Sequence, residues 1–403
     1  MPNAQGLLKQ TVFAKQSGLG VPAVSGGQIT RRTSSVFTLG RDTYESNEIT
    51  SHQQSTGANA GIQKTAGKLD GLVSAGTYAP QIASLLRKPF VATTAITAAS
   101  ITIAGAGPSY TLTRAAGSFL TDGVKIGDVV RLTVGTFNAA NLNKNLLVTG
   151  VAATILTVRV MNGSTLVAEG PITGATVTVP GKKTWVPTTG HANDYWTIEE
   201  WYSDLAKSEL FTDVKIAKAD VTLPATGNAT VSFDCPGLNR VRGSAQAIAA
   251  PAVETSSNVL SAVNALILVN GVLTPITGCQ FSIDGHIQPG EAEVGSNTIT
   301  DMIRGEVSAS GSFTGKFSNT LLQDIYDQQT VVSLILPVVD GSAAAADFVV
   351  FTLSAVKVFG DSPDDGEAKE IIRTYPFTAQ INSAGGAALA NLQTIVSVQD
   401  SLA

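Results

Sequence analysis

The chain has 403 residues, of which 43% are hydrophobic and only 14% carry a charge, and its net charge at pH 7 is −5. Because typical soluble domains carry about 25% charged residues, this surface is poorly protected against association. No lysine or arginine run has the density of a nucleic-acid footprint, which argues against tight DNA binding. No run of about 20 apolar residues predicts a membrane span. We therefore expect copies of the same chain to cover much of the surface; a protein that simply aggregates is the alternative.

Residues 1–27 are rich in Gly, Ala, Gln and Ser and show weak periodicity. They lack the continuous apolar run of a secretory signal. The sequence predicts an N-terminal arm that becomes ordered on a neighbouring molecule, with a frayed terminus as the alternative. Cys235 and Cys279 are too few for a disulfide framework, so we expect reduced thiols in a protein made in a cytoplasm.

Residues 28–91 begin with an alternating pattern from Gln28 to Thr50 that predicts a β-strand. The polar stretch 51–61 then predicts a long hairpin tip, and a second strand is expected from about Ile62 to Thr77. Prolines on either side bracket a short helix over 81–88. The same alternating pattern returns in 185–250, where a hairpin is predicted from Phe211 to Leu223 and onward to Asp234.

Residues 92–184 differ in composition and strand spacing. Thr, Val, Ala and Gly dominate, and short alternating strands recur about every ten residues. Gly127-Asp128 and Asn162-Gly163 supply turn residues between strands. The segment predicts a small β-barrel or sandwich, inserted into a first domain made of 28–91 and 185–250. Residues 251–403 are then expected to form a second domain.

The second domain repeats the order of the first: strand, polar tip, strand, short helix, strand and hairpin. Its tip is predicted at 284–297 and its helix at 318–327. Phe37-Thr38-Leu39-Gly40 resembles Phe281-Ser282-Ile283-Asp284, and Ser74-Ala75-Gly76 resembles Ala309-Ser310-Gly311. These similarities predict an internal duplication. Chance similarity between two Ala/Ser/Gly-rich β segments is the alternative.

No set of residues with catalytic spacing emerges. The three histidines, His52, His191 and His286, have no Cys or His at metal-ligand spacing. Glu199 and Glu200 are adjacent on a predicted strand, so their side chains point to opposite faces and cannot flank one glycosidic bond. We expect no enzyme activity, no cofactor and no metal.

An acidic cluster follows the strand near Phe359 and contains Asp361, Asp364, Asp365 and Glu367. Its spacing does not match an EF-hand loop. We expect a solvated acidic turn, with a cation site as the alternative.

Five segments share a family pattern: Tyr44-Glu45-Ser46-Asn47-Glu48, Gly67-Lys68-Leu69, Ser74 to Tyr78 with the following helix, the hairpin from Phe211, and Thr374 to Ala379. They resemble the tail tube proteins of long-tailed, siphovirus-type bacteriophages. The resemblance covers roughly 28–90, 195–245 and 265–400, and the insert at 92–184 departs from it.

The resemblance implies an all-β fold of two tandem tail-tube-type β-sandwich domains, each with a short flanking helix, plus the inserted β domain. Inner sheets of neighbours would join into a barrel around a lumen that passes DNA without sequence-specific binding. Since most such rings hold six tube domains, a duplicated chain implies a homotrimer ring with pseudo-sixfold symmetry; a hexamer is the second choice. The insert would project outward.

The resemblance further implies that rings stack through the tips and through the arm, about residues 3–20. The candidate inter-ring contacts are Glu45, Glu48, His52, Gln54, Asn59, His286, Gln288, Glu291 and Glu293. Expected partners are other copies, the tape measure, terminator and distal tail proteins, in the virion tail, after assembly in the host bacterial cytoplasm. The alternatives are a tail decoration protein or adhesin that binds a cell-surface ligand, a tail terminator or a baseplate hub.

Overall fold

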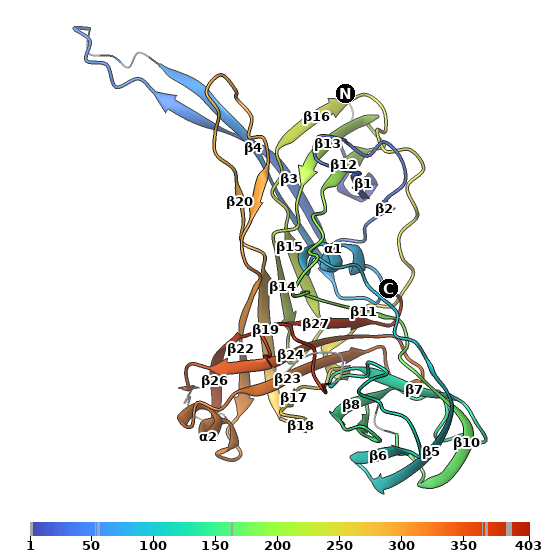
Figure 1. The fold of residues 1–403 in the computed structure, drawn as a ribbon. Coiled ribbons are helices and arrows are strands. Elements are labelled where there is room, and N and C mark those ends of the chain that lie inside the picture. Colours follow the sequence, from blue (N-terminus) through green and yellow to red (C-terminus); the bar gives the residue numbers. More distant parts are fainter. Residues whose placement is uncertain are drawn as a thin grey trace.

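The computed structural model describes residues 3–52, 54, 57–162, 164–364, 366, 370–383 and 389–403. Strands dominate this part of the chain, and two short α-helices accompany them (Figure 1). The all-β class expected from the alternating apolar pattern is therefore confirmed. The strands form one long sheet, one five-stranded sheet, a closed barrel and a small two-stranded ribbon.

The five-stranded sheet contains the N-terminal segment. Its order is β16 (Asn239–Gly243), β13 (Lys207–Val214), β12 (Trp196–Tyr202), β1 (Lys9–Lys15) and β2 (Gln28–Ile29). Val12 and Phe13 in β1 are buried, because this apolar run pairs along its whole length with β12. The prediction that residues 1–27 form an arm on a neighbour is thus wrong for β1, which belongs to the core of its own chain.

The long sheet crosses both halves of the chain. One part of it runs in the order β3-β4-β15-β14-β19-β22-β26-β24, and the β14–β19 pair joins the first half to the second. The bounds are β3 (Ser34–Glu45), β4 (Ala58–Leu72), β14 (Lys218–Leu223), β15 (Thr230–Asp234), β19 (Ile276–Asp284), β22 (Ser308–Lys316), β24 (Phe348–Val358) and β26 (Ile372–Ala379).

Beyond β24 the sheet continues through β23 (Val332–Val339), β17 (Leu268–Val269) and β18 (Val272–Leu273). Three short strands join from the side: β11 (Lys182–Trp185), β25 (Ser362–Asp364) and β27 (Ser397–Asp400). One apolar cluster extends from Phe13 to Val398 under both halves. The two halves therefore share one core.

The inserted segment forms a closed six-stranded barrel. Its order is β10 (Glu169–Thr178), β5 (Ile96–Ala106), β6 (Ser109–Arg114), β9 (Ile155–Val160), β8 (Leu146–Val151) and β7 (Val129–Val134). It has its own apolar core. At the base, Val91 and Lys183 form an antiparallel bridge, with backbone N–H···O distances of 2.8 and 2.9 Å. Entry and exit of the insert therefore lie side by side.

Further contacts fix the barrel against β11 and against the second half. The Lys183 ammonium lies 2.9 Å from the Asp128 carboxylate, and both side chains are buried. The Gln399 side-chain oxygen accepts the Val129 N–H at 2.7 Å. A satellite apolar cluster joins Leu147 of the barrel to Phe348 of β24. These contacts hold the barrel in a fixed position against the rest of the chain.

The two helices are α1 (Ala79–Leu85) and α2 (Leu321–Asp327), which confirms both predicted helices with shifted bounds. The predicted single strand from Phe211 to Leu223 is wrong. The chain leaves the five-stranded sheet after β13 and enters the long sheet at β14, and residues 215–217 between them bond to the 234–236 backbone. Alternation continues through this crossing, so periodicity alone does not reveal it.

Candidate functional site

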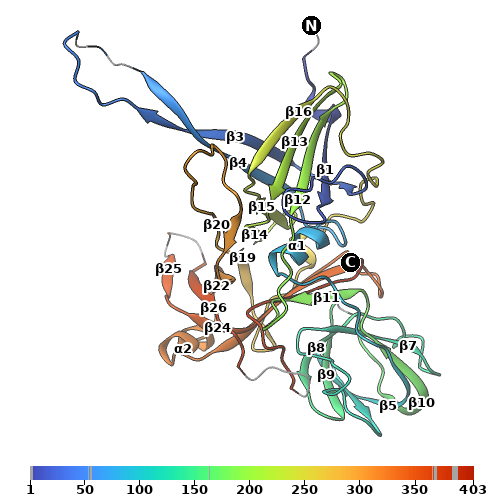
Figure 2. The same cartoon turned by 45° about the horizontal axis from the view of Figure 1, so that its top comes forward.

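Two tips project from the same end of the long sheet (Figures 1 and 2). The first tip is the turn between β3 and β4, residues 46–57, and with the adjoining strand ends it carries five of the predicted contact residues. All five are exposed: Glu45, Glu48, His52, Gln54 and Asn59. Ile49, which sequence reasoning did not single out, is fully exposed at 103%.

The second tip, residues 285–307, contains the ribbon of β20 (Ile287–Pro289) and β21 (Met302–Arg304). The other four predicted residues, His286, Gln288, Glu291 and Glu293, are exposed on it. Val294 is fully exposed at 109%. Each tip thus presents a glutamate followed by a bare β-branched residue, Glu48-Ile49 and Glu293-Val294. In the sequence, these exposed apolar residues are marked by a glutamate followed by a β-branched residue within a polar stretch.

The base of the second tip is clamped to the body. Arg87 donates to the carbonyls of Gly285 and Gly305 at 3.0 and 2.7 Å. The Gln63 N–H donates to the Asn297 carbonyl at 2.9 Å and so ties the second tip to β4 below the first. The structure therefore joins at their bases two loops that are more than 200 residues apart in sequence.

Lys215 lies in the same clamp. Its ammonium donates to the Asn193 side-chain oxygen at 2.6 Å and sits 4.0 Å from the centre of the Tyr195 ring. Burial lowers the pKa of Lys215 to about 8, against an ordinary 10.5. The cavity beside it has a volume of only about 10 Å³, and its contacts with Asn193 and Tyr195 hold the 192–195 loop in place.

One face of the long sheet packs on the core and the other is polar. A row of polar residues crosses the second face through six strands: Asp70, Ser232, Asp220, Ser282, Ser310 and Thr378. Two lysines on this face have acidic neighbours: Lys218 lies 3.0 Å from Asp220, and Lys64 lies 3.2 Å from Asp42. A hydrogen bond to Asp220 raises the pKa of Lys218. The register resolves the strand parity that the glycine-rich sequence left open.

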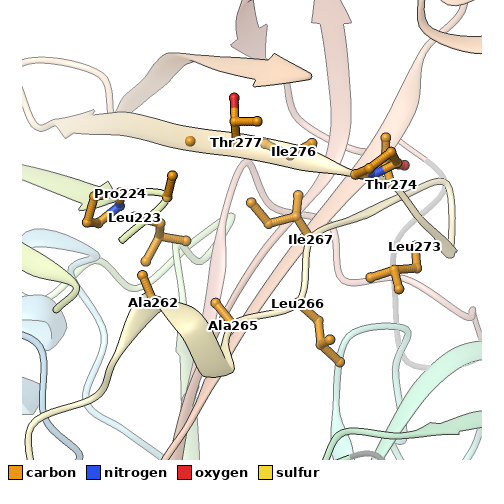
Figure 3. Close-up of a pocket in the computed structure, with 13 residues that line it drawn as sticks. Leu223, Pro224, Ala262, Ala265, Leu266, Ile267, Leu273, Thr274, Ile276 and Thr277 are labelled. Atoms are coloured by element: carbon orange, nitrogen blue, oxygen red, sulfur yellow. The ribbon is translucent and has the colours of Figure 1, made fainter. Parts of the chain in front are cut away.

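An apolar pocket lies at the opposite end of β19 from the second tip (Figure 3). Its volume is about 330 Å³, and none of the thirteen described residues that line it carries a charge. Leu223 and Pro224 from the β14 end face Ile267, Leu273 and Ile276 across it. The pocket can accept an aliphatic side chain.

The remaining polar candidates have structural contacts. Glu199 accepts the backbone N–H groups of Ala247 and Ile248, while Glu200 pairs with Lys9 at 2.5 Å. Both glutamates are buried on opposite faces of β12. Asp361 of the acidic turn pairs with Arg373 at 2.5 Å and is only 13% exposed, so it is not solvated as expected. Asp365 and Glu367 lie outside the described residues.

Both cysteines are free and buried, and burial raises the pKa of the Cys279 thiol to about 12. Within the described residues, no group of three or more His, Cys, Asp or Glu side chains is placed to hold a metal ion. No helix in that part of the chain is long and apolar enough to cross a membrane.

The arrangement offers projecting tips, a receiving pocket and a long polar sheet face, which are features of assembly. No curated protein sequence matches the chain. A protein-family model described as phage tail tube protein matches residues 4–379. The chain therefore belongs to the phage tail tube protein family and is a structural, non-enzymatic component of the virion tail that assembles with itself and with other tail proteins.

Proposed function

We propose that this chain is the major tail tube subunit of a long-tailed, siphovirus-type phage and that it carries two tube domains. Each half contributes four adjacent positions to the long sheet: β3, β4, β15 and β14 from the first half, then β19, β22, β26 and the β24–β25 edge from the second. A short helix follows the second strand of each set, α1 after β4 and α2 after β22. This repeated order is the observation that carries the proposal.

The strand registers support the duplication in detail. Phe37 pairs with Gly67, and Phe281 pairs with Gly311. This correspondence differs from the sequence alignment, which matched Gly311 with Gly76. Gly76 lies in the turn before α1, with φ +74°, whereas Gly311 lies inside β22. The counterpart of Gly311 is thus Gly67, because both glycines leave room for a phenylalanine on the neighbouring strand.

A ring forms when the two end strands of this eight-strand set meet the end strands of neighbouring chains. Three chains supply six tube domains, so a homotrimer ring has pseudo-sixfold symmetry. A hexamer of chains doubles the number of domains and would need a much wider ring. The polar face lines the lumen in this arrangement. Because Lys64 and Lys218 on this face lie beside aspartates, the face should bind DNA phosphates weakly, which suits a channel that DNA slides through.

Stacking of rings assigns a role to the tips. In our proposal Glu45, Glu48, His52, Gln54 and Asn59 on the first tip, and His286, Gln288, Glu291 and Glu293 on the second, contact the adjacent ring. The apolar pocket at the far end of β19 receives an exposed aliphatic residue of a tip. Tape measure, terminator and distal tail proteins would contact the inside and the ends of such a tube.

Electron microscopy and native mass spectrometry of the purified full chain test this function. We expect rings and stacked tubes, with a ring mass of three chains of 41.5 kDa. A ring of six chains would refute the trimer and leave the tube. A protein that stays monomeric at every concentration and salt level would refute the tube itself.

A further inference from the structure

Strand β3 is an open edge of the long sheet. Its only partner among the described strands is β4, so no described strand covers its other side in the single chain. Val36 on this edge is 56% exposed. A long exposed edge invites pairing with another strand, and natural proteins avoid such edges or cover them.

A second open edge lies at the other end of the eight-strand set. Val358 of β24 pairs with Phe377, and Ser362 of β25 pairs with Thr374, so both strands run along β26. On the outer side, β23 covers β24 only as far as the Val332–Val356 pair. Residues 357–364 therefore lack an outer neighbour among the described strands, and Phe359 there is 59% exposed.

One junction between two such strand sets is already formed within the chain. At the β14–β19 pair, the last strand of the first set meets the first strand of the second set in an antiparallel register. Asp220 lies opposite Ser282 in that register. If the two sets are equivalent, the same register describes how the open edges of two chains meet.

The strand registers relate this junction to the two open edges. In the first set one row reads Ser34, Asp70, Ser232 and Asp220. In the second set the corresponding row reads Gly278, Thr314, Thr374 and Ser362. Ser362 is therefore the counterpart of Asp220. Thr38 follows Phe37 as Ser282 follows Phe281, so Thr38 is the counterpart of Ser282.

We propose that neighbouring chains in the ring join β3 of one copy to the 357–364 edge of the next, antiparallel, with Thr38 opposite Ser362. This inference rests on the proposed tube function and specifies its partner surface. It brings the hydroxyls of Thr38 and Ser362 together, a favourable cross-strand pair.

The lengths of the two edges agree with this register. The open window 357–364 lies opposite residues 36–42, because the pairs with β26 leave one extra residue on this edge between Val358 and Ser362. Strand β3 changes register between Arg41 and Thr43, which lies opposite Val358 and Lys357 when the β24–β26 pairs are followed. At that point β23 begins to occupy the outer side of β24. The bulge thus lets β3 leave the junction where the neighbouring edge closes.

Paired cysteines test the register in assembled full-length protein. In T38C/S362C tubes, mild oxidation or a short bifunctional thiol reagent should link neighbouring chains into a ladder that ends at three. The native thiols give little background, because Cys235 and Cys279 are buried. D220C/S282C is the matched positive control and should link within one chain. V36C/S362C moves the pair by two residues and should link at least several-fold less.

Mixed assemblies guard against a variant that fails to fold. Differently sized T38C and S362C chains, co-assembled, should give only mixed dimers. Tubes in which V36C/S362C links better than T38C/S362C would overturn the register while leaving the tube function intact. A wild-type chain that forms neither rings nor tubes would remove the tube function and, with it, this junction.

Discussion

The two glycines that face phenylalanines provide a sharp test of the described packing. An ideal Cβ at Gly67 would lie 2.0 and 2.1 Å from two ring atoms of Phe37. At Gly311 the nearest atoms are backbone, with the Gln280 oxygen at 2.3 Å and the Phe281 Cα at 2.8 Å. A ring can be removed by mutation, whereas a strand backbone cannot.

We expect G67A to destabilise the chain by about 1–3 kcal/mol through overpacking. F37A should cost about 3–5 kcal/mol, because it removes a buried aromatic side chain. The double variant F37A/G67A should cost less than the sum by about 1–3 kcal/mol, since the truncated ring no longer meets the new methyl group. In F281A/G311A the backbone clash remains, so the two costs should add.

Guanidinium unfolding followed by tryptophan fluorescence measures these free energies, at one chain concentration because assembly stabilises the folded state. The F281A/G311A cycle serves as the matched control. Additive costs for F37A and G67A would refute the close approach of the Phe37 ring to Gly67. Equal coupling in both cycles would refute the distinction between ring and backbone contacts.

Three further outcomes are expected. I49S and V294S should leave unfolding unchanged, because both side chains are fully exposed. They should shorten tubes in electron micrographs if each buries about 1.5–3 kcal/mol of apolar contact in the next ring, and tubes of normal length would contradict their role. D128N should destabilise the barrel by about 3–5 kcal/mol, since it leaves Lys183 buried without its charge partner. Hydrogen exchange should become faster only within residues 96–178, and unchanged exchange there would contradict the expectation. The Asp400 carboxylate accepts the Gly76 N–H at 2.8 Å, and burial raises its pKa to about 6 from 3.8. The folded state thus binds this proton more tightly than the unfolded state, so the stability of the wild type relative to D400N should rise by up to about 3 kcal/mol as pH falls from about 7 to 4; a flat difference would refute the buried carboxylate.

Local patterns in the sequence predicted the strands, both helices, the barrel and the two tips. Each of these rests on alternation, proline brackets or turn residues within a short window. The role of β1 was missed because Val12-Phe13-Ala14 is too short to reveal that it pairs with β12, about 190 residues away. The crossing between β13 and β14 was missed because alternation continues while the strands change sheets.

The candidate contact residues on the tips came from the family resemblance and the predicted polar tips, and the structure shows that all nine are exposed. The pocket could not be predicted from the sequence, because Leu223, Ile267 and Ile276 come from separate segments that the sheet order brings together. The polar face needed the register, since Gly and Ser do not mark which side of a strand faces the core.

The antiparallel bridge between Val91 and Lys183 has a consequence for how this subunit can change. The chain departs for the barrel and returns at neighbouring points, so a different module with closely spaced termini fits the same graft site. A short turn closing that bridge would leave the long sheet continuous. The barrel can therefore be exchanged by recombination while the strand order of the long sheet is kept.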